Sequence, residues 1–334
     1  MNVLSLFNGM SFCSMALESL GVNVNKMYSS EIDKYANQAT QAMFPDTIQL
    51  GDVTQWREWD IDWASIDLVT GGFPCQAWSM AGKQLGDKDE RGMLFWTMLD
   101  IMKHVKYHNP KADFLIENVK MKKEFEQYIT THTENALGKV HKILINSALV
   151  SAQNRNRYYW TSFEVSQPED RGILLKDIIE HDGDYTIMSE KFVNRQKGRK
   201  CLRDDLEGKA VNLSAMEYVK NGRQGDYIRT GFVKKDKSRA IISSIGRTTG
   251  REYFKKNQGE LVFYDDFEFT THNECKKYYR KLTPRECFRL QTVPEYHIDT
   301  LLSAGISNTQ LYKMCGNGWT MEVIKHIFKA LAIN

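Results

Sequence analysis

The sequence predicts an α/β protein in which a doubly wound, mostly parallel sheet is joined to a smaller, irregular, β-containing part. Two observations predict this fold class. Short apolar runs alternate with longer helix-like stretches through the first 161 residues, which is the rhythm of strand–helix units. Glycine and acidic residues follow the ends of several of these runs, at the edge where a parallel sheet collects its ligands.

Each element of the first part follows from its local pattern. Apolar and β-branched runs predict strands at Val3–Phe7, Lys26–Ser30, Asp46–Leu50, Ile66–Thr70, Phe114–Ile116, Val140–Asn146, Ala148–Val150 and Arg157–Thr161. Helices are predicted at Ser14–Leu20, Tyr35–Met43, Met93–His104 and Glu124–Leu137. Strands and helices therefore take turns along the chain, which favours parallel pairing.

The alternation stops near residue 165. From there to residue 280 the chain is polar and rich in lysine, arginine and glycine, with short β-prone pieces at Ala240–Ser244 and Glu260–Tyr264. Two helices are predicted to close the chain, Thr283–Leu290 and Met321–Leu331, and the first begins with a capping box. We therefore divide the chain into residues 1–164, 165–280 and 281–334.

Composition favours a globular protein that is neither secreted nor embedded in a membrane. The chain has 334 residues, of which 42% are hydrophobic, and a net charge of +3, so it can bury a core and its overall charge favours no partner. No apolar run approaches the ~18 residues that span a bilayer, and the amino terminus lacks the basic flank of a signal peptide. The six cysteines include no C-x-x-C pair, so we expect free thiols and no metal. These features predict a soluble cytoplasmic protein.

One cysteine stands where a nucleophile would. The segment Gly-Gly-Phe-Pro-Cys-Gln-Ala-Trp-Ser, residues 71–79, follows the predicted strand Ile66–Thr70. Cys75 is therefore held by a scaffold and yet reachable, as nucleophilic attack requires. A lone cysteine is more often a small buried hydrophobe, but Pro74 and the preceding glycines favour the reactive alternative. A free thiol has a pKa near 8.5, so we expect a helix amino terminus or an arginine to activate it.

A carboxyl group is predicted to face that thiol. The strand-like run Asp113–Ile116 delivers Glu117, Asn118 and Val119. If the strands before Cys75 and Glu117 end at the same edge of one parallel sheet, the two side chains converge on one pocket. Such a pair suits chemistry on an electron-poor ring, because one group attacks carbon while the other handles a ring nitrogen.

Three earlier strand ends indicate an adenosine site. Gly9 lies in a strand-to-helix turn that lets a ligand approach the backbone. Glu31 follows about 20 residues later, at a position where a carboxylate takes both hydroxyls of a ribose. Asp52 ends the third strand and is placed to take an adenine amino group. A structural turn or a solvated surface acid is the alternative for each residue alone, but the three together favour the site.

Two basic features remain open at this point. Gln-Asn-Arg-Asn-Arg at 153–157 puts two guanidinium groups on one face of a strand, either as a surface feature or to bind a carbonyl, phosphate or thiolate. The basic runs 195–200 and 234–239 are either solvated loops or phosphate contacts. His104 and His108 have i,i+4 spacing but no third ligand nearby, so we interpret them as a solvated helix face.

These motifs together resemble those of the cytosine-5 DNA methyltransferase family of bacterial or phage type. They are Phe-Pro-Cys-Gln at 73–76, Glu-Asn-Val at 117–119, Gln-x-Arg-x-Arg at 153–157, Arg-Lys-Leu-Thr-Pro-Arg-Glu at 280–286 with Arg-Leu-Gln at 289–291, and Gly-Asn at 316–317. Five such motifs in this order are a highly specific set. The resemblance runs through residues 3–160 and 280–328, and the segment between sits where the family keeps its target-recognition domain.

The resemblance implies a Rossmann-like methyltransferase that uses S-adenosyl-L-methionine and releases S-adenosyl-L-homocysteine. Residues 1–164 would be the catalytic, cofactor-binding domain, 165–280 the target-recognition domain, and 281–334 a connecting helix and the return to the catalytic domain. The implied cofactor-binding residues are Phe7, Asn8, Gly9, Met10, Glu31, Ile32, Asp52, Val53, Leu94 and Asn317. The implied catalytic residues are Pro74, Cys75, Glu117, Asn118, Val119, Arg155 and Arg157.

Two positions depart from the family pattern. Ser11 and Phe12 follow Met10 where the family usually has more glycine, which puts the contact with the methionine end of the cofactor in doubt. Trp319 stands where a small residue is more usual, and we expect it to cover the mouth of the cofactor site.

The implied partner is double-stranded DNA. We predict DNA contacts from Gln76, Ser79, Lys83, Arg91, Arg195, Arg199, Lys200, Lys234, Lys235 and Arg247. We further expect a monomer with no membrane association, in a bacterial cell or in the host cell of a phage. The sequence leaves open whether a cognate restriction endonuclease accompanies it, and it does not reveal the recognition site.

The implied activity is methylation of C5 of cytosine at a specific short DNA sequence, by attack of Cys75 on C6 of a flipped-out base. Three rivals stay open. The same chemistry on RNA is the nearest. A methylase or hydroxymethylase of free nucleotides is another, although it would not need the basic segment 165–280. The third is a DNA-binding module that has lost catalysis.

Overall fold

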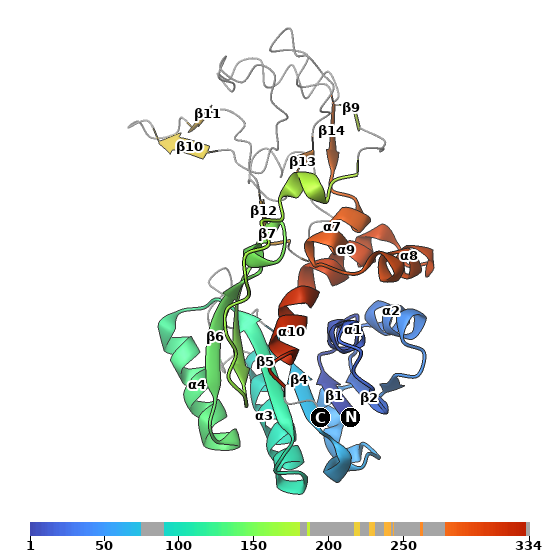
Figure 1. Cartoon of the computed structure of the whole chain (residues 1–334), viewed down its shortest axis with the longest axis vertical. Helices are drawn as coiled ribbons and strands as arrows, with labels where there is room; N and C mark the ends of the chain where they lie inside the picture. The colour runs from blue at the N-terminus through green and yellow to red at the C-terminus, as the bar shows by residue number, and fades with distance from the viewer. Residues whose placement is uncertain are drawn as a thin grey trace.

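The structure of the protein is a computed structural model, and it describes residues 1–74, 90–180, 186–187, 217–220, 227–230, 237–241, 243, 261–262 and 278–331. A seven-stranded sheet forms its centre (Figure 1). The strands of this sheet are β1 (Asn2–Leu6), β2 (Lys26–Ser30), β3 (Ile48–Gln49), β4 (Leu68–Gly71), β5 (Asp113–Val119), β6 (His141–Asn146) and β8 (Asn156–Thr161).

The sheet is mostly parallel, as the sequence predicts. Its strands are ordered β3-β2-β1-β4-β5-β8-β6. The first five are parallel to one another, and β8 runs antiparallel to both of its neighbours, β5 and β6. The carboxyl ends of β1 to β5 and the amino end of β8 therefore meet at one edge of the sheet.

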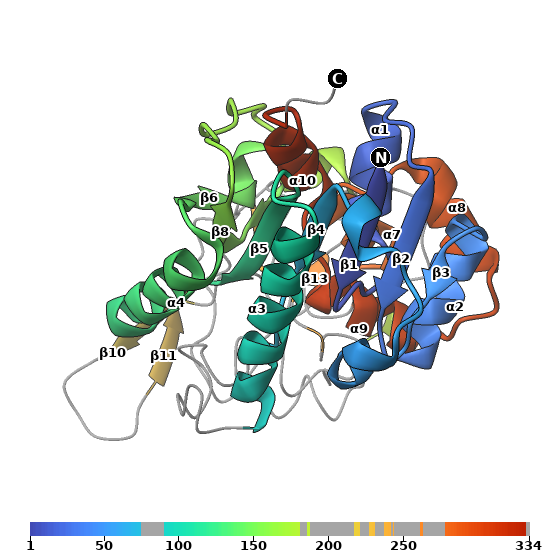
Figure 2. The ribbon, with the colours of Figure 1, turned by 90° about the horizontal axis from the view of Figure 1, so that it is seen from below.

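Helices cover both faces of the sheet (Figure 2). The helices of the first part are α1 (Phe12–Ser19), α2 (Lys34–Met43), α3 (Glu90–His108) and α4 (Lys123–Leu137). α3 and α4 pack together over one face, while α1 packs against α10 (Met321–Phe328) over the other. The carboxyl-terminal segment thus returns to complete the layer that the amino-terminal helix begins.

Alternation along the strands divides the core between the two faces. In β5, Leu115 belongs to the apolar cluster of α1 and α10, whereas Phe114 and Ile116 belong to that of α3 and α4. β8 repeats the division with Tyr159 and Trp160. Because successive side chains of a strand point to opposite faces, residue 117 lies on the face of α1 and α10.

The carboxyl-terminal part holds more helix than the sequence predicts. α7 (Pro284–Leu290) begins with the expected capping box: Glu286 N donates to Thr283 Oγ1 over 3.1 Å, and Thr283 N donates to Glu286 Oε2 over 2.7 Å. α8 (Glu295–Ser303) and α9 (Asn308–Asn317) follow, and neither is predicted by the local pattern. α10 ends at Phe328, three residues before the predicted end.

Two strand predictions are wrong: Ala240–Ser244, whose described residues 240, 241 and 243 lie in no strand, and Ala148–Val150. Residues Ala148–Val150 are not a strand, because Ser147–Leu149 form a 3₁₀ helix, η5. The side chain of Asn146 accepts a hydrogen bond from Ala148 N over 3.1 Å, and this local bond turns the backbone away from the sheet. The other 3₁₀ helices described are η1 (Val53–Glu58), η2 (Trp63–Ser65) and η6 (Leu175–Asp177).

Short strands are described in the segment predicted to be irregular. They are β9 (Thr186–Ile187), β10 (Glu217–Lys220), β11 (Tyr227–Thr230), β12 (Ser238–Arg239), β13 (Leu261–Val262) and β14 (Tyr278–Lys281). β14 pairs with β13 and β9 next to α7 (Figure 1), and β10 pairs with β11. β12 pairs in parallel with β7 (Gln153–Asn154), so the segment touches the first part there. In the described part of the chain, no helix combines the length and apolarity needed to cross a membrane.

Candidate active site

The turn after β1 is tight and held by its own side chains. Phe7, Gly9 and Ser11 all have left-handed backbone conformations, with φ of 53°, 58° and 66°. Such angles are costly for residues other than glycine and persist only where the surroundings enforce them. Here the Asn8 side chain donates to Ser11 Oγ over 2.8 Å, and the Ser11 hydroxyl lies 2.9 Å from that of Thr40. The segment Phe7–Ser11 is therefore a fixed cradle rather than a loose loop.

Glu31 binds this cradle to the end of β2. Its Oε2 accepts a hydrogen bond from Gly9 N over 2.8 Å, and its Oε1 accepts from the backbone N–H groups of Ile32 and Asp33, each over 2.9 Å. A carboxylate offers about four acceptor positions. The described donors use three of them, which leaves one position on Oε2 for a ligand hydroxyl.

The other predicted cofactor residues line the same edge, and several fit an adenosine. The apolar side chain of Ile32 is 76% exposed beside Glu31, where the face of a flat ring can rest on it. Asp52 caps η1 by accepting from Thr54 through Oδ1. Asn8 Oδ1 is buried and has no hydrogen-bond partner in the described part of the chain. An unsatisfied buried acceptor of this kind fits a site that a polar ligand completes.

Four further predicted cofactor residues differ in exposure. Met10 and Val53 are buried in the apolar core, so their side chains support the cradle from behind. Leu94 is half-buried in α3, and Asn317 is exposed at the end of α9. Their contact with a cofactor stays a prediction.

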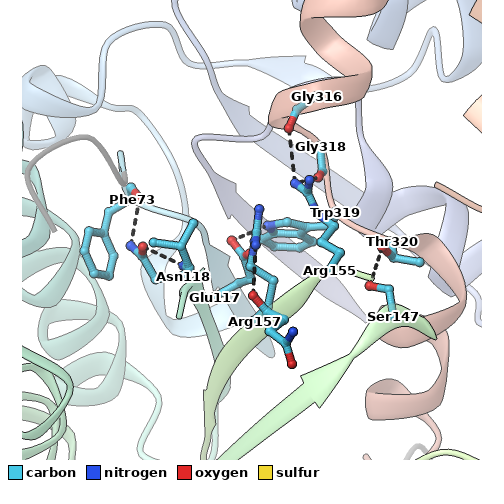
Figure 3. A network of polar contacts seen from close by, with 12 residues as sticks. Phe73, Glu117, Asn118, Ser147, Arg155, Arg157, Gly316, Gly318, Trp319 and Thr320 are labelled. Atoms are coloured by element: carbon cyan, nitrogen blue, oxygen red, sulfur yellow. Dashed lines mark hydrogen bonds and ion pairs between the residues drawn. The ribbon is translucent and has the colours of Figure 1, made fainter. Parts of the chain in front are cut away.

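Glu117 lies at the centre of a polar cluster (Figure 3). It is 8% exposed and sits within β5, on the face of α1 and α10. Arg157 Nε lies 2.9 Å from Glu117 Oε1, and Trp319 Nε1 donates to Glu117 Oε2 over 3.0 Å. Each oxygen of the carboxylate thus has its own donor, and the two donors come from β8 and from the loop after α9.

Burial and charge act on Glu117 in opposite directions. Burial raises the pKa of the Glu117 carboxyl above its ordinary value, while Arg157, Arg155 and the Trp319 N–H oppose that rise. A carboxyl group whose pKa is raised toward neutrality can exchange a proton with a substrate.

Asn118 connects Glu117 to the loop that carries Cys75. Its side chain points to the opposite face of β5 and donates to the carbonyl oxygen of Phe73 over 3.0 Å. Pro74, the last described residue of this loop, is half-buried. A Cβ atom placed on Gly72 would lie 3.1 Å from Glu117 Oε2, so the base of the loop lies against the carboxylate. Cys75 itself lies outside the described residues.

Arg155 is buried, and its guanidinium holds backbone carbonyl groups. It is 3% exposed, and its guanidinium donates to the carbonyl oxygens of Ile241, Gly316 and Gly318 over 3.0, 3.2 and 2.7 Å. Burial and the nearby Arg157 lower the pKa of Arg155 to about 9, so the group remains charged at neutral pH. Arg155, which lies between β7 and β8, is therefore joined to Ile241 and to the end of α9 and the loop that presents Trp319.

Replacing Arg155 with methionine should destabilise the protein by about 3 kcal/mol or more, because three buried carbonyl groups lose a charged donor. Urea unfolding followed by circular dichroism measures the change. Arg57→Met is the matched control, since the Arg57 side chain is 70% exposed and lies 3.9 Å from Asp100; little change is expected there. Equal midpoints for the two variants would contradict the assigned role.

The predicted DNA contacts fall almost wholly outside the described residues. Those outside are Gln76, Ser79, Lys83, Arg195, Arg199, Lys200, Lys234, Lys235 and Arg247. The backbone of Arg91 lies in the first turn of α3.

The histidine pair of α3 is packed ring against ring. The ring centroids of His104 and His108 lie 4.6 Å apart. Among the described residues, no group of three or more side chains could hold a metal ion.

Sequence reasoning missed the partner of the candidate carboxylate. The sequence predicts Trp319 over the cofactor mouth, which stays a prediction, and it does not predict the hydrogen bond from Trp319 to Glu117. Gly72 and Gly318 belong to the same cluster, and the sequence does not predict their contacts there. The signal available was the unusual tryptophan after Gly-Asn-Gly at 316–318, which marks a changed environment without naming its neighbour.

The fold is similar to that of a solved methyltransferase. The solved structure of the Entamoeba histolytica methyltransferase EhMeth is similar over 99% of this chain and 97% of that one, with a TM-score of 0.67 and 15% identity. The family model of the C-5 cytosine-specific DNA methylases matches residues 1–332, and the chain belongs to this family. It is 32% identical to the type II methyltransferase M1.ScrFI of Lactococcus lactis subsp. cremoris, over 91% of this chain and 71% of the relative.

A second relative matches along nearly its full length. The type II methyltransferase M.HhaI of Haemophilus parahaemolyticus is 29% identical over 97% of this chain and 92% of its own. Family membership confirms the resemblance drawn from the five motifs and implies methylation of cytosine in DNA with S-adenosylmethionine as the methyl donor.

Proposed function

We propose that the protein methylates C5 of cytosine at a specific short sequence of double-stranded DNA, through covalent attack by Cys75 on C6 of a flipped-out base. The observation that carries the proposal is the position of Glu117. The carboxylate is buried, bonded to Arg157 and Trp319, and in contact with the base of the loop that leads to Cys75. Family membership supports the reaction class.

The residues would act as follows. A bond forms between Cys75 Sγ and C6 of the cytosine while the protonated Glu117 carboxyl delivers its proton to N3, so that the electron pair of the C5–C6 double bond becomes available at C5. C5 then takes the methyl group. Loss of the C5 proton to a base expels the thiolate, breaks the S–C6 bond and returns the N3 proton to Glu117. None of this is possible within a stacked duplex, so the base must leave it.

S-adenosylmethionine would supply the methyl group as a substituent of a positively charged sulfur. Phe7–Met10, Glu31, Ile32, Asp52, Val53, Leu94 and Asn317 would hold it; the left-handed turn, the free acceptor position on Glu31 Oε2 and the exposed Ile32 support this assignment. Arg157 would orient Glu117 and meet the cytosine carbonyl, and Arg155 would steady the site through backbone carbonyls.

The remaining assignments follow from the same proposal. Residues 165–280 would recognise the DNA, with phosphate contacts from the basic runs, Lys83 and Arg91. The protein would act as a monomer in the cytoplasm of a bacterial cell, or in the host of a phage. A cognate restriction endonuclease fits the type II names of the relatives.

Bisulfite sequencing of DNA from cells that express the chain tests the function. We expect 5-methylcytosine at one short sequence in nearly all copies, and unmodified cytosine elsewhere. Purified enzyme offered duplex DNA, tRNA and free dCMP in competition should transfer label to the duplex. Preferred labelling of tRNA or dCMP would replace the proposal by one of its rivals, and no labelling of any substrate would favour a DNA-binding module without catalysis.

A further inference from the structure

Trp319 makes a contact that the proposed chemistry does not require. Its indole N–H donates to Glu117 Oε2 over 3.0 Å, on the oxygen that Arg157 leaves free (Figure 3). The two residues are 202 positions apart in the chain. The contact is therefore a product of the packing of α9 and its following loop against the sheet.

The indole of Trp319 packs closely against Gly72. A Cβ atom at Gly72 would lie 2.9 Å from Trp319 Nε1 and 3.3 Å from its Cζ2, as well as 3.1 Å from Glu117 Oε2. Real Cβ atoms essentially never come within 3.0 Å of another atom, so the 2.9 Å approach to Trp319 Nε1 would force a shift. The absence of a side chain at position 72 thus lets the indole and the carboxylate meet.

Gly318, the residue before Trp319, packs closely against Phe12. A Cβ atom at Gly318 would lie 2.1 Å from Phe12 Cε2, so the Phe12 ring occupies that space. Arg155 holds the Gly318 carbonyl over 2.7 Å. Phe12 therefore packs against the glycine that precedes Trp319, so the two departures from the family pattern meet at Gly318.

We propose that Trp319 is a positioning residue for Glu117: its indole N–H fixes the plane of the carboxylate and stabilises the charged form. The inference rests on the proposed function and adds to it a residue that acts through Glu117. The charged and titratable groups that face Glu117 are Arg157 on β8, Arg155 before it and Tyr159 on the same strand, and burial keeps Tyr159 protonated by raising its pKa.

Loss of the indole N–H should shift the pKa of Glu117 in a defined direction. A donor to a carboxylate favours the ionised form, so its removal should raise the pKa of Glu117. It should also loosen the orientation of the carboxyl and slow the chemical step, while S-adenosylhomocysteine and DNA still bind with wild-type affinity. An indole that only fills space would show neither the shift nor the separation between rate and binding.

The test is Trp319→Phe, which keeps an aromatic ring and removes the donor. Single-turnover methyl transfer is measured from pH 5 to 9, and the ionisation that disappears in Glu117→Gln is assigned to Glu117. We expect a rate about 3- to 10-fold lower than wild type and a midpoint raised by roughly 0.5–1 pH unit, the range for loss of one typical intramolecular hydrogen bond. Trp59→Phe is the matched control, because Trp59 Nε1 is buried without a hydrogen-bond partner in the described residues.

A second variant leaves the side chains of Trp319 and Glu117 unchanged. Gly72→Ala introduces the Cβ atom that separates the indole from the carboxylate, and it should lower the rate to a similar degree. If both variants act by breaking the same bond, the double variant will be about as slow as either single variant, whereas independent effects would multiply. The rate of Gly72→Ala tests the role of the indole even where Trp319→Phe folds poorly. The comparison of rates also remains informative where the ionisation of Glu117 lies outside the pH range.

Two results would overturn the inference: a Trp319→Phe rate within twofold of wild type with an unmoved midpoint, or effects of Gly72→Ala and Trp319→Phe that multiply. Failure of the proposed function has a different signature. Glu117→Gln would then be as active as wild type, or wild-type enzyme would transfer no methyl group to duplex DNA.

Discussion

Replacing Cys75 with alanine is expected to abolish methyl transfer to duplex DNA, by on the order of 10⁴-fold or more, while S-adenosylmethionine still binds. The reason is chemical. C5 of cytosine is too weak a nucleophile to take a methyl group unaided, and without the thiolate nothing adds to C6. Most of the proposed cofactor residues follow the ends of β1, β2 and β3, the others lie in α3 and α9, and none of them is the thiol.

Covalent attack has its own measurement. Duplex DNA carrying 5-fluorocytosine at the target should form a protein–DNA adduct that survives denaturing electrophoresis, because fluorine blocks the final loss from C5. Cys75→Ala should form none. Cys13→Ala is the matched control and should form the adduct, since burial raises the pKa of Cys13 to about 12 and keeps that thiol protonated. Full activity of Cys75→Ala, or no adduct from active wild-type enzyme, would remove Cys75 from its role.

Replacing Glu117 with glutamine is expected to slow single-turnover methyl transfer about 10²- to 10⁴-fold, the usual range for loss of a general acid or base. The amide keeps the shape of the side chain but cannot give N3 a proton. It also leaves the half-buried Arg157 guanidinium, whose Nε lies 2.9 Å from the carboxylate, without its counter-charge. The ionisation assigned to Glu117 should vanish from the pH profile of the variant.

A matched glutamate separates the chemistry from general effects of a buried charge. Glu126 is also buried, at 7% exposure, and pairs with Lys142 on the α4 side of the sheet. Glu126→Gln should change the stability of the protein and leave the rate constant of methyl transfer within about twofold of wild type. Equal rate losses in the two variants would mean that Glu117 acts only through folding.

Local patterns predict most of the sheet and its covering helices. β2 has the predicted bounds, Lys26–Ser30, and the apolar run Phe114–Ile116 lies within β5 as predicted. The capping box of α7 is equally local. α8 and α9 escape prediction because their stability comes from tertiary burial of residues such as Leu301 and Leu311, while polar residues and Gly316 weaken the helical signal.

The sequence likewise predicts one part of the candidate site and not the other. The order of strand ends brings the Gly9 turn, Glu31, Asp52 and Glu117 to one edge, and this follows from the alternation of strands and helices. The strand face of Glu117 also follows from the two-residue period of β5. The partners of Glu117 and Arg155 do not follow from any period.

By itself, then, the sequence determined the fold class, the family and the strand ends that carry the chemistry, since spacing and periodicity act over a few residues and are written in the local order of side chains. Only the tertiary structure decided that Trp319 meets Glu117 and that Arg155 holds Gly318, across 202 and 163 residues. Hydrogen bonds form only within about 3 Å and in favourable directions. Such contacts are therefore set by how helices and loops pack on the sheet, which no local pattern specifies.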